Sequence, residues 1–334
     1  MSHPAGPIWE SISGISRFAA LATMAELGCA DQLAEGPLSA EELALRCGAH
    51  APSLRRVLRE LAGMGIVRSV EQGRYELTEE GSSLRSDAPD STLPAVRMIA
   101  EEGFWYALGN LPATVRQGRS AFVERYGPLY ERLGRLPEVG AVFDDYMTSR
   151  AVPFARQVAE RYDFSQVETL VDVAGGKGHI LASVLRAYPG LRGVLVDLEH
   201  VVPGAAQALD AQGLTDRCEV LAGDFFVKVP EGADAYLLAS ILHNWDDHDA
   251  ERILRRVREA IRQDGRLLIL EMVLPDEDVP HVGKDMDMRM LALFDGGTER
   301  TRQEYAVLLE KAGFQLREVF DLSAGASLVE AVPV

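Results

Sequence analysis

The sequence predicts an α/β protein with two main parts, a mostly helical N-terminal part and a C-terminal part in which helices cover a parallel β-sheet. Three observations carry this prediction. From Glu168 onward, short apolar runs alternate with stretches of helical periodicity. The first of these runs leads directly into a glycine-rich turn, as a strand does before a helix in many parallel sheets. In the first third of the chain, by contrast, apolar residues recur at helical spacing.

The C-terminal part is expected to contain seven strands. Five of them follow one another with helical stretches in between, and two more follow a last helix. The expected strands cover 170–174, 193–196, 218–221, 235–240, 267–271, 315–321 and 326–332, and the expected helices cover 178–187, 201–211, 247–262 and 301–312.

The N-terminal part is predicted to have the outline of a winged helix. Ser39 and Glu42 form a capping-box pattern at the start of one helix, and Gly48 is expected to end it. Pro52 is expected to open a second helix, and a short hairpin is expected over 66–77. Two helices followed by a hairpin are typical of this motif, and further helices are predicted over 90–165.

The charge balance argues against nucleic acid as the main partner. The chain has 34 basic and 51 acidic residues, a formal net charge of −17, and such a chain repels phosphate backbones. The second expected helix does carry Arg55, Arg56 and Arg59, but glutamates surround it in the sequence. A structural or dimerisation role is therefore favoured over DNA binding for the winged-helix-like part.

Composition disfavours other classes of protein. No uncharged run is long enough to span a membrane, and the first residues lack the pattern of a signal peptide. Cys29, Cys47 and Cys218 lie far apart in the sequence and form no CxxC pair, so neither a disulfide framework nor a zinc site is predicted. We expect a cytoplasmic protein without membrane contact.

Residues at the ends of three expected strands predict a site for an adenosine-containing cofactor. The glycine-rich turn Val171-Asp-Val-Ala-Gly-Gly-Lys-Gly178 follows the first strand. Asp197 ends the second strand, where a carboxylate can bind a ribose diol. Asp224 and Phe225 follow the third strand and offer an acceptor for the adenine amino group beside a ring that can stack on adenine. The competing interpretation makes both aspartates helix caps.

The glycine-rich turn disfavours cofactors that carry phosphates. Leu181 stands where the dinucleotide pattern G-x-G-x-x-G has its third glycine, and the chain contains no P-loop pattern. S-adenosylmethionine contains adenosine but no phosphate, and it is therefore the cofactor that the sequence favours.

These motifs, with three further stretches, resemble the small-molecule O-methyltransferases typified by plant caffeic acid O-methyltransferases and bacterial polyketide-tailoring enzymes. The resemblance covers about residue 10 onward, and the further stretches are Gly223-Asp-Phe-Phe226, Leu242-His-Asn-Trp245 and Gly296-Gly-Thr-Glu-Arg-Thr301. It implies a Rossmann-like class I methyltransferase domain over 163–334, a winged-helix-like dimerisation domain over 1–100, and between them a helical linker and substrate-lid region over 101–162. It also implies a homodimer joined through the N-terminal domain.

The resemblance assigns roles to individual residues. The expected catalytic set is His243 as general base with Glu271 and Glu299 as its acidic supports. The expected cofactor-binding residues are Asp172, Gly175, Gly176, Asp197, Leu198, Asp224, Phe225 and Ser240. The expected substrate-binding residues are Trp105, Phe143, Met147, Asn244, Met290 and Phe294, of which a single aromatic residue such as Trp105 has a core position as its competing interpretation.

The sequence departs from the family pattern at three positions. Ala174 stands where the family often has glycine, Asn244 stands where aspartate is common, and Ala239 replaces a polar side chain found in some members. The run Asp246-Asp-His-Asp249 resembles a metal cluster, but we interpret it as the acidic start of a helix capped by Asp246.

The chemistry predicted from these residues is in-line methyl transfer to a hydroxyl of a small aromatic molecule, such as a polyketide or a phenol. The donor is already activated, so the protein must align the nucleophile and accept its proton. A free histidine has a pKa near 6.5 and a phenol near 10, so histidine accepts the proton as the new bond forms. No metal is required. Two alternatives stay open: hydroxylation or decarboxylation on the same fold, and a winged-helix regulator that senses a small ligand.

Overall fold

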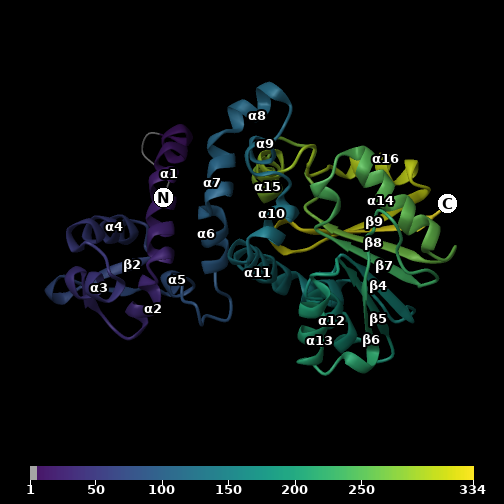
Figure 1. The fold of residues 1–334 in the computed structure, drawn as a ribbon, viewed down its shortest axis with the longest axis horizontal. Coiled ribbons are helices and arrows are strands. Elements are labelled where there is room, and N and C mark those ends of the chain that lie inside the picture. Colours follow the sequence, from purple (N-terminus) through teal and green to yellow (C-terminus); the bar gives the residue numbers. More distant parts are fainter. Residues whose placement is uncertain (1–5) are drawn as a thin grey trace. The chain divides into compact units, whose positions relative to one another are not determined.

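The computed structural model describes residues 6–334, which form two compact units (Figure 1). The first unit comprises the described residues up to Trp105 together with Glu138–Ser149, and the second comprises Tyr106–Pro137 and Arg150–Val334. The three-part division expected from the sequence stays a prediction. Among the described residues, no helix combines the length and the apolarity that crossing a membrane requires.

The first unit has the predicted winged-helix outline with one additional strand. Ser39 and Glu42 form the capping box, and Gly48 ends the helix in a left-handed conformation, as expected. The unpredicted strand β1 pairs with β3, which gives a three-stranded sheet in the order β1-β3-β2. The elements are α1 (Pro7–Glu26), α2 (Cys29–Ala34), β1 (Leu38–Ser39), α3 (Ala40–Cys47), α4 (Ala51–Gly63), β2 (Val67–Val70), β3 (Arg74–Leu77), α5 (Glu79–Ser82) and α6 (Leu93–Ala100).

Helix α4 contributes the centre of the first unit's core. Leu54, Leu58 and Leu61 lie on one face of the helix and are buried, and burial of each leucine stabilises the fold by about 1.5–3 kcal/mol. On the polar side, Arg55 pairs with Glu41 of α3.

Two cysteines that are distant in the sequence meet in this unit. The Sγ atoms of Cys29 and Cys47 are 3.7 Å apart, much farther than the length of about 2.05 Å for a disulfide, so both are free thiols. Burial, and then the neighbouring thiol of Cys47, raise the pKa of Cys29 to about 12. No spacing rule predicts this contact, because α2 and α3 bring the two residues together only in the folded unit.

The predicted helical region is present as a series of helices. They are α7 (Glu102–Gly109), α8 (Leu111–Gln117), α9 (Ala121–Tyr126), α10 (Leu129–Arg135) and α11 (Pro137–Arg161).

The second unit is built on a seven-stranded sheet in the order β6-β5-β4-β7-β8-β10-β9. Strands β4 to β8 are parallel to one another, whereas β10 runs antiparallel to its neighbours β8 and β9. Each predicted strand is found within two residues of its expected bounds, but helix α15 was not predicted. The elements are β4 (Thr169–Val173), α12 (His179–Ala187), β5 (Arg192–Asp197), α13 (Val202–Asp210), β6 (Cys218–Ala222), β7 (Ala235–Ala239), α14 (Asp247–Ala260), β8 (Arg266–Glu271), α15 (Val282–Leu293), α16 (Arg302–Lys311), β9 (Phe314–Asp321) and β10 (Ser327–Pro333).

Alternate residues of the parallel strands face opposite layers of helices. Figure 1 shows α12 and α13 on one side of the sheet and α14 and α16 on the other. In β4, Leu170 packs with the first layer and Val171 with the second. Burial on both faces explains why these strands appear in the sequence as continuous apolar runs.

The strand order places the candidate site at the carboxyl ends of the central parallel strands. Strand β4 has β5 on one side and β7 on the other, so the chain changes direction across the sheet at this point. The carboxyl ends of neighbouring parallel strands are aligned, because Val173 pairs with both Val196 and Leu238. Ligands of open α/β sheets bind in the crevice at such a switch point.

Candidate active site

The turn after β4 has a backbone that few residues other than glycine tolerate. Gly176 and Gly178 have positive φ angles of 58° and 73°, and Ala174 has one of 57°. A Cβ atom on Gly175 would lie 2.6 Å from the carboxyl group of Asp172. The turn therefore passes closely over Asp172, and the glycine expected by the family pattern at 174 is replaced by an alanine in a left-handed conformation.

Asp172 is a buried carboxyl group with an unsatisfied oxygen. Its side chain is 1% exposed, and within the described part of the chain its Oδ1 has no hydrogen-bond partner. Burial, and then the negative charge of Asp197, raise the pKa of Asp172 to about 7. A buried acceptor without a partner beside a glycine turn fits a site that holds a hydrogen-bond donor of a ligand.

The carboxylates of Asp197 and Asp224 stabilise loops rather than helix starts. Asp197 accepts hydrogen bonds from the backbone N–H groups of Gly176 at 2.8 Å and Leu198 at 2.7 Å. Asp224 accepts one from the N–H of Phe226 at 2.8 Å. Helix α13, which follows Asp197, has no side-chain cap. The helix-cap interpretation is therefore wrong for Asp197, whose carboxylate instead joins the end of β5 to the glycine turn.

An aromatic cluster lies beside the end of β6. The ring of Phe226 packs edge-on against Trp245 at 4.8 Å, and the ring of Phe225 lies 6.2 Å from Trp245. The guanidinium of Arg252 covers Phe226 at 4.8 Å. Phe226 and Trp245 thus support Phe225, the residue expected to contact adenine, and Trp245 was not among the predicted site residues.

His243 lies in a short 3₁₀ turn, Leu242–Asn244, between β7 and α14. Its Nδ1 is 2.7 Å from Oε1 of Glu299 and 3.1 Å from Oε2 of Glu271. All three side chains are buried. The structure thus brings together the predicted histidine and both predicted acids, although Glu299 is 56 residues away in the sequence.

The two acids fix the protonation of the ring. An ionised carboxylate can accept hydrogen bonds but cannot donate them. The ring nitrogen that faces the two acids, Nδ1, therefore carries the proton and donates a hydrogen bond to Glu299. The neutral ring then has its lone pair on Nε2. Burial by itself lowers the pKa of His243, but the charges of Glu271 and Glu299 and the hydrogen bond to Glu299 outweigh burial, and the pKa lies above its ordinary value.

Glu271 also holds the backbone of the turn. Its Oε1 accepts hydrogen bonds from the N–H groups of Ile241 and Leu242, both at 2.9 Å, and lies 3.4 Å from that of His243. Burial raises the pKa of Glu271 to about 7 against the opposing effect of His243. One carboxyl group at the end of β8 therefore positions both the ring and the main chain of His243.

Asn244 contacts a helix rather than the histidine ring. Its Nδ2 donates to Oη of Tyr130 on α10 at 2.9 Å and to the carbonyl of Ser240 at 3.2 Å. Burial of the hydroxyl, and then the charges of Asp197 and Glu271, raise the pKa of Tyr130. Tyr130 was not among the predicted site residues, and nothing in its local sequence pattern indicates this contact across 114 residues.

The other expected substrate residues fall into two groups. Met290 lies on α15 in a small cluster of buried methionines, with Phe294 packed against it, and the ring of Phe294 lies 6.2 Å from that of Tyr130. Trp105, Phe143 and Met147 belong to the first unit, where Trp105 stacks on Phe18 at 5.3 Å. The substrate-binding role of all these residues stays a prediction.

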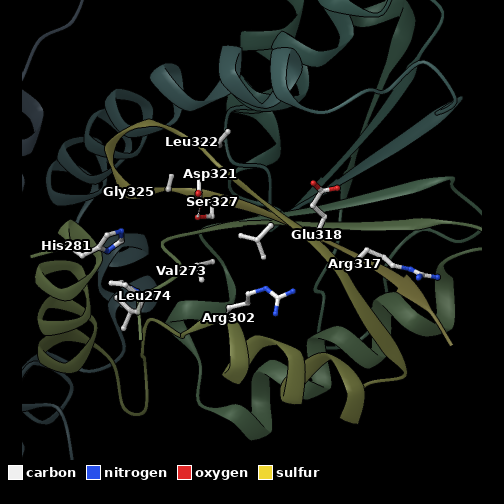
Figure 2. Close-up of a pocket in the computed structure, with 13 residues that line it drawn as sticks. Val273, Leu274, His281, Arg302, Arg317, Glu318, Asp321, Leu322, Gly325 and Ser327 are labelled. Carbon is white, nitrogen blue, oxygen red and sulfur yellow. Dashed lines mark hydrogen bonds between the residues drawn. The ribbon is translucent and has the colours of Figure 1, made fainter. Parts of the chain in front are cut away.

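A separate cavity of about 660 Å³ lies behind the end of β8. Figure 2 shows Asp321 and Ser327 close together in its wall, with His281 and Arg302 on other sides. None of the predicted catalytic, cofactor-binding or substrate-binding residues lines it. The cavity is therefore distinct from the candidate site at the strand ends.

The acidic segment that follows Trp245, residues 246–249, forms the start of helix α14. Oδ1 of Asp246 accepts a hydrogen bond from the backbone N–H of Asp249 at 2.8 Å and caps α14, as predicted. Asp246, His248 and Asp249 also lie close enough together to share a cation, but exposed acidic groups of this kind are common at helix starts.

Comparison with known proteins decides the family. The sequence pattern of the O-methyltransferase domain matches residues 105–315, and that of the O-methyltransferase dimerisation domain matches residues 9–87. The chain belongs to this family. It is a S-adenosylmethionine-dependent O-methyltransferase of natural-product biosynthesis, with the class I methyltransferase fold that the sequence predicted.

Individual relatives cover nearly the whole chain. The phenazine O-methyltransferase PhzM of Lysobacter antibioticus is 39% identical over 97% of this chain and 95% of its own. The crystal structure of LaPhzM superposes with a TM-score of 0.92 at 38% identity over 98% of both chains. An O-methyltransferase of neocarzinostatin biosynthesis, solved with S-adenosylmethionine and 2-hydroxy-5-methyl naphthoic acid, has a TM-score of 0.84 at 35% identity over 95% and 96% of the two chains.

Some relatives carry other activities in their names, such as N-methylation or hydroxylation. The aclacinomycin 10-hydroxylase RdmB of Streptomyces purpurascens is 35% identical over 89% of this chain and 81% of its own.

Proposed function

We propose that this O-methyltransferase transfers the methyl group to a hydroxyl of a small aromatic natural product, with His243 as general base. The observation that supports the proposal most is that Glu271 and Glu299 both contact Nδ1 of His243. This arrangement leaves Nε2 as the proton acceptor. It follows the same logic as other histidine–acid pairs, in which the acid orients the ring and stabilises its charged form.

The cofactor supplies a methyl group on a positively charged sulfur. The residues suited to hold it are Asp197 for the ribose, Asp224 and Phe225 for the adenine, and the turn of Gly175 and Gly176 for the remainder, with Asp172 as an acceptor beneath that turn. Leu198 follows Asp197 at the end of β5, and Ser240 follows β7, which pairs with β4. The unsatisfied oxygen of Asp172 and the close approach at Gly175 support this assignment.

His243 then accepts a proton from the acceptor hydroxyl as the new bond forms. A phenol with a pKa near 10 does not ionise in advance at neutral pH. The raised pKa of His243 narrows this gap, and the two acids stabilise the imidazolium that results. Since the ring must be neutral to act, kcat/KM should rise with pH through the pKa of His243, at a pH above the ordinary histidine value near 6.5.

Replacement of His243 tests the proposed base. His243→Ala should lower kcat by about 10²–10⁴-fold while the Kd for S-adenosylhomocysteine, measured by calorimetry, changes little. His248→Ala is a matched control, because His248 is exposed on the same segment and is expected to leave both quantities unchanged. Unchanged turnover in His243→Ala would remove the assigned base.

The proposed class of methyl acceptor, a small aromatic molecule, rests on a structurally similar enzyme and on the apolar residues expected to contact the substrate. The neocarzinostatin enzyme was solved with a hydroxynaphthoic acid, and Met290 and Phe294 offer an apolar, adaptable surface here. A screen of aromatic polyketides and phenolic acids with a labelled methyl donor should reveal turnover of a compound with a free hydroxyl. Methylation confined to amines or to non-aromatic alcohols would contradict this proposal.

We further propose that catalysis needs no metal. The ligand atoms of His243, Glu271 and Glu299 lie within 4.8 Å of one another, but Nδ1 of His243 is already engaged with Oε1 of Glu299 at 2.7 Å. Activity is expected to survive EDTA treatment and extensive dialysis. Loss of activity that Mg²⁺ or Zn²⁺ restores would overturn this part of the proposal.

A second candidate reaction is hydroxylation or decarboxylation of an aromatic substrate, favoured by the likeness to aclacinomycin 10-hydroxylase. Formation of one S-adenosylhomocysteine for each product molecule would support methyl transfer and exclude this alternative.

The hypothesis of a winged-helix regulator that senses a small ligand is tested separately. A sequence-specific gel shift with DNA that persists at moderate salt would revive it.

We propose a homodimer that uses α1. Ile8, Ile12 and Ile15 recur at helical spacing and are 74%, 49% and 63% exposed, and the helix lies within the matched dimerisation domain. Such an exposed apolar stripe indicates a protein interface. Ile12→Glu should convert a dimer into a monomer in light scattering, whereas Leu45→Glu, at another exposed apolar position, should not. A monomeric parent protein would contradict the proposal.

A further inference from the structure

A buried arginine lies next to the catalytic acids and has no assigned role. Arg300 follows Glu299 in the sequence and is 2% exposed. Its Nη1 donates to the carbonyl of Leu242 at 3.0 Å, and its Nη2 donates to the carbonyl of Trp245 at 2.9 Å. Its Nε donates to Asp247 at 3.0 Å. The two terminal nitrogens of the guanidinium, which form its fork, therefore bind both ends of the turn that carries His243.

The same segment holds the middle of the turn. The backbone N–H of Thr298 donates to the carbonyl of His243 at 2.8 Å. The carbonyl groups of Leu242, His243 and Trp245 are thus all bound by residues 298–300, while Glu271 binds the N–H groups from the other side. Very little of the turn's backbone is left to move independently of the two acids.

This arrangement links the position of His243 to that of Glu299. Arg300 and Glu299 are consecutive, so the contact that fixes the turn and the contact that fixes the ring come from one short segment. A buried guanidinium is costly to desolvate unless its donors are satisfied, and here Leu242, Trp245 and Asp247 accept from all three of its nitrogens.

We propose that Arg300 is a positioning residue for the general base: by binding the carbonyl groups at both ends of the 242–245 segment, it keeps Nδ1 of His243 in hydrogen-bond contact with Glu299. The inference rests on the proposed role of His243. It attributes to Arg300 no contact with substrate or cofactor.

The inference predicts a specific physical change when the fork is removed. Without Arg300 the turn relaxes away from residues 298–300, and the 2.7 Å contact between Nδ1 and Glu299 lengthens. The carboxylates then stabilise the charged ring less, which lowers the pKa of His243, whereas loss of the positive charge of Arg300 by itself would raise it. A lowered pKa therefore reports the lost positioning and not the lost charge. A role in general stability alone would reduce the amount of folded protein without changing this pKa.

The deciding experiment is an NMR titration of the histidine rings in the isotope-labelled full chain, which needs neither substrate nor turnover. The spectrum of His243→Ala assigns the His243 signal. Arg300→Lys keeps the charge but not the two carbonyl contacts, so it should lower the pKa of His243 by about half a unit or more. Arg300→Met should also lower it, by a smaller amount, because the lost charge acts in the opposite direction. An unchanged pKa in folded Arg300→Lys would overturn the inference.

Kinetics supply a second readout. Arg300→Met should lower kcat by about 10²-fold, the usual effect of a misplaced catalytic group, with the Kd for S-adenosylhomocysteine within about threefold. The acid limb of the kcat/KM profile should move to lower pH. If the parent chain shows no methyl transfer, the proposed function fails, but the NMR shift still tests the positioning role by itself.

Two variants separate the carbonyl contacts from other effects. Arg258 is a matched control: it also binds backbone carbonyl groups, those of Gly313 and Val334, but far along α14. Arg258→Met should leave the His243 pKa and kcat unchanged. Asp247 is exposed, so Asp247→Asn should lower kcat less than about threefold. An effect of Asp247→Asn as large as that of Arg300→Met would show that the ion pair, not the carbonyl fork, matters, and would overturn the inference.

Discussion

Asp172 makes the folded protein less stable at high pH, and Asp172→Asn should remove this effect. The carboxyl group is 1% exposed, and burial together with the charge of Asp197 raises its pKa to about 7. In the unfolded chain an aspartate has a pKa near 3.9. The folded state therefore binds the proton more tightly, and stability is lost as pH rises from about 4 to about 7.

The magnitude follows from the two pKa values. A difference of about 3 units corresponds to about 4 kcal/mol once both states are ionised. With a folded pKa of about 7, the loss is about 1.5 kcal/mol at pH 5 and about 4 kcal/mol at pH 8. Asparagine does not titrate. Any difference in packing or hydrogen bonding between the asparagine of the variant and the parent aspartate is the same at both pH values, so it cancels when the stability difference at pH 5 is compared with that at pH 8. The stability gained by Asp172→Asn should therefore grow by about 2.5 kcal/mol between pH 5 and pH 8.

Urea unfolding of the cofactor-free protein measures this change. The chain has three tryptophans, and replacement of Trp9 and Trp105 by phenylalanine leaves Trp245 as a fluorescent reporter of the second unit. Asp216→Asn, at an exposed position, is the control and should shift stability by less than about 0.5 kcal/mol at either pH. A stability difference between Asp172→Asn and the parent that is the same at both pH values would refute the reasoning.

Three other predictions follow from the described geometry. Ala174→Gly should stabilise the fold by up to about 1 kcal/mol, because Ala174 has a φ of 57° that glycine adopts without strain; a lower urea midpoint would contradict this. Glu299→Gln removes a charge that raises the pKa of His243, so the acid limb of kcat/KM should shift to lower pH while its maximum falls at least about tenfold; an unshifted limb counts against the pairing. Cys29, buried and with its pKa raised to about 12, should react with iodoacetamide at pH 8 only after unfolding, and rapid labelling of the folded chain would contradict the burial.

Most of the fold could be predicted because its signals are local. Apolar runs buried on both faces mark the parallel strands, and Ser39 with Glu42 marks a helix start by side chains three residues apart. Helix α15 escaped prediction because its charged residues and methionines give no clear apolar stripe in the sequence. Strand β1 is only two residues long and depends on its partner β3 rather than on its own sequence.

In the candidate site, too, the residues with local sequence signals could be predicted, whereas the contacts made by tertiary packing could not. Asp197, Asp224 and His243 each follow a recognisable strand, so their shared location could be derived from topology. The contact between Tyr130 and Asn244 joins residues 114 positions apart, and the fork of Arg300 reaches back 58 positions to Leu242. Such contacts exist only through tertiary packing, and no spacing rule in a single sequence indicates them.

The placement of β10 has a consequence for how the chain is made. Strand β8, which ends at Glu271, needs β10 as its neighbour, and Ser327 pairs directly with Glu271. On the ribosome, residues 266–271 emerge well before 327–333, and meanwhile β8 presents an open apolar edge to the crowded cell. Such edges attract other strands. Chaperone dependence and aggregation during overproduction should therefore respond most strongly to substitutions in β10, even though no residue of that strand belongs to the candidate site.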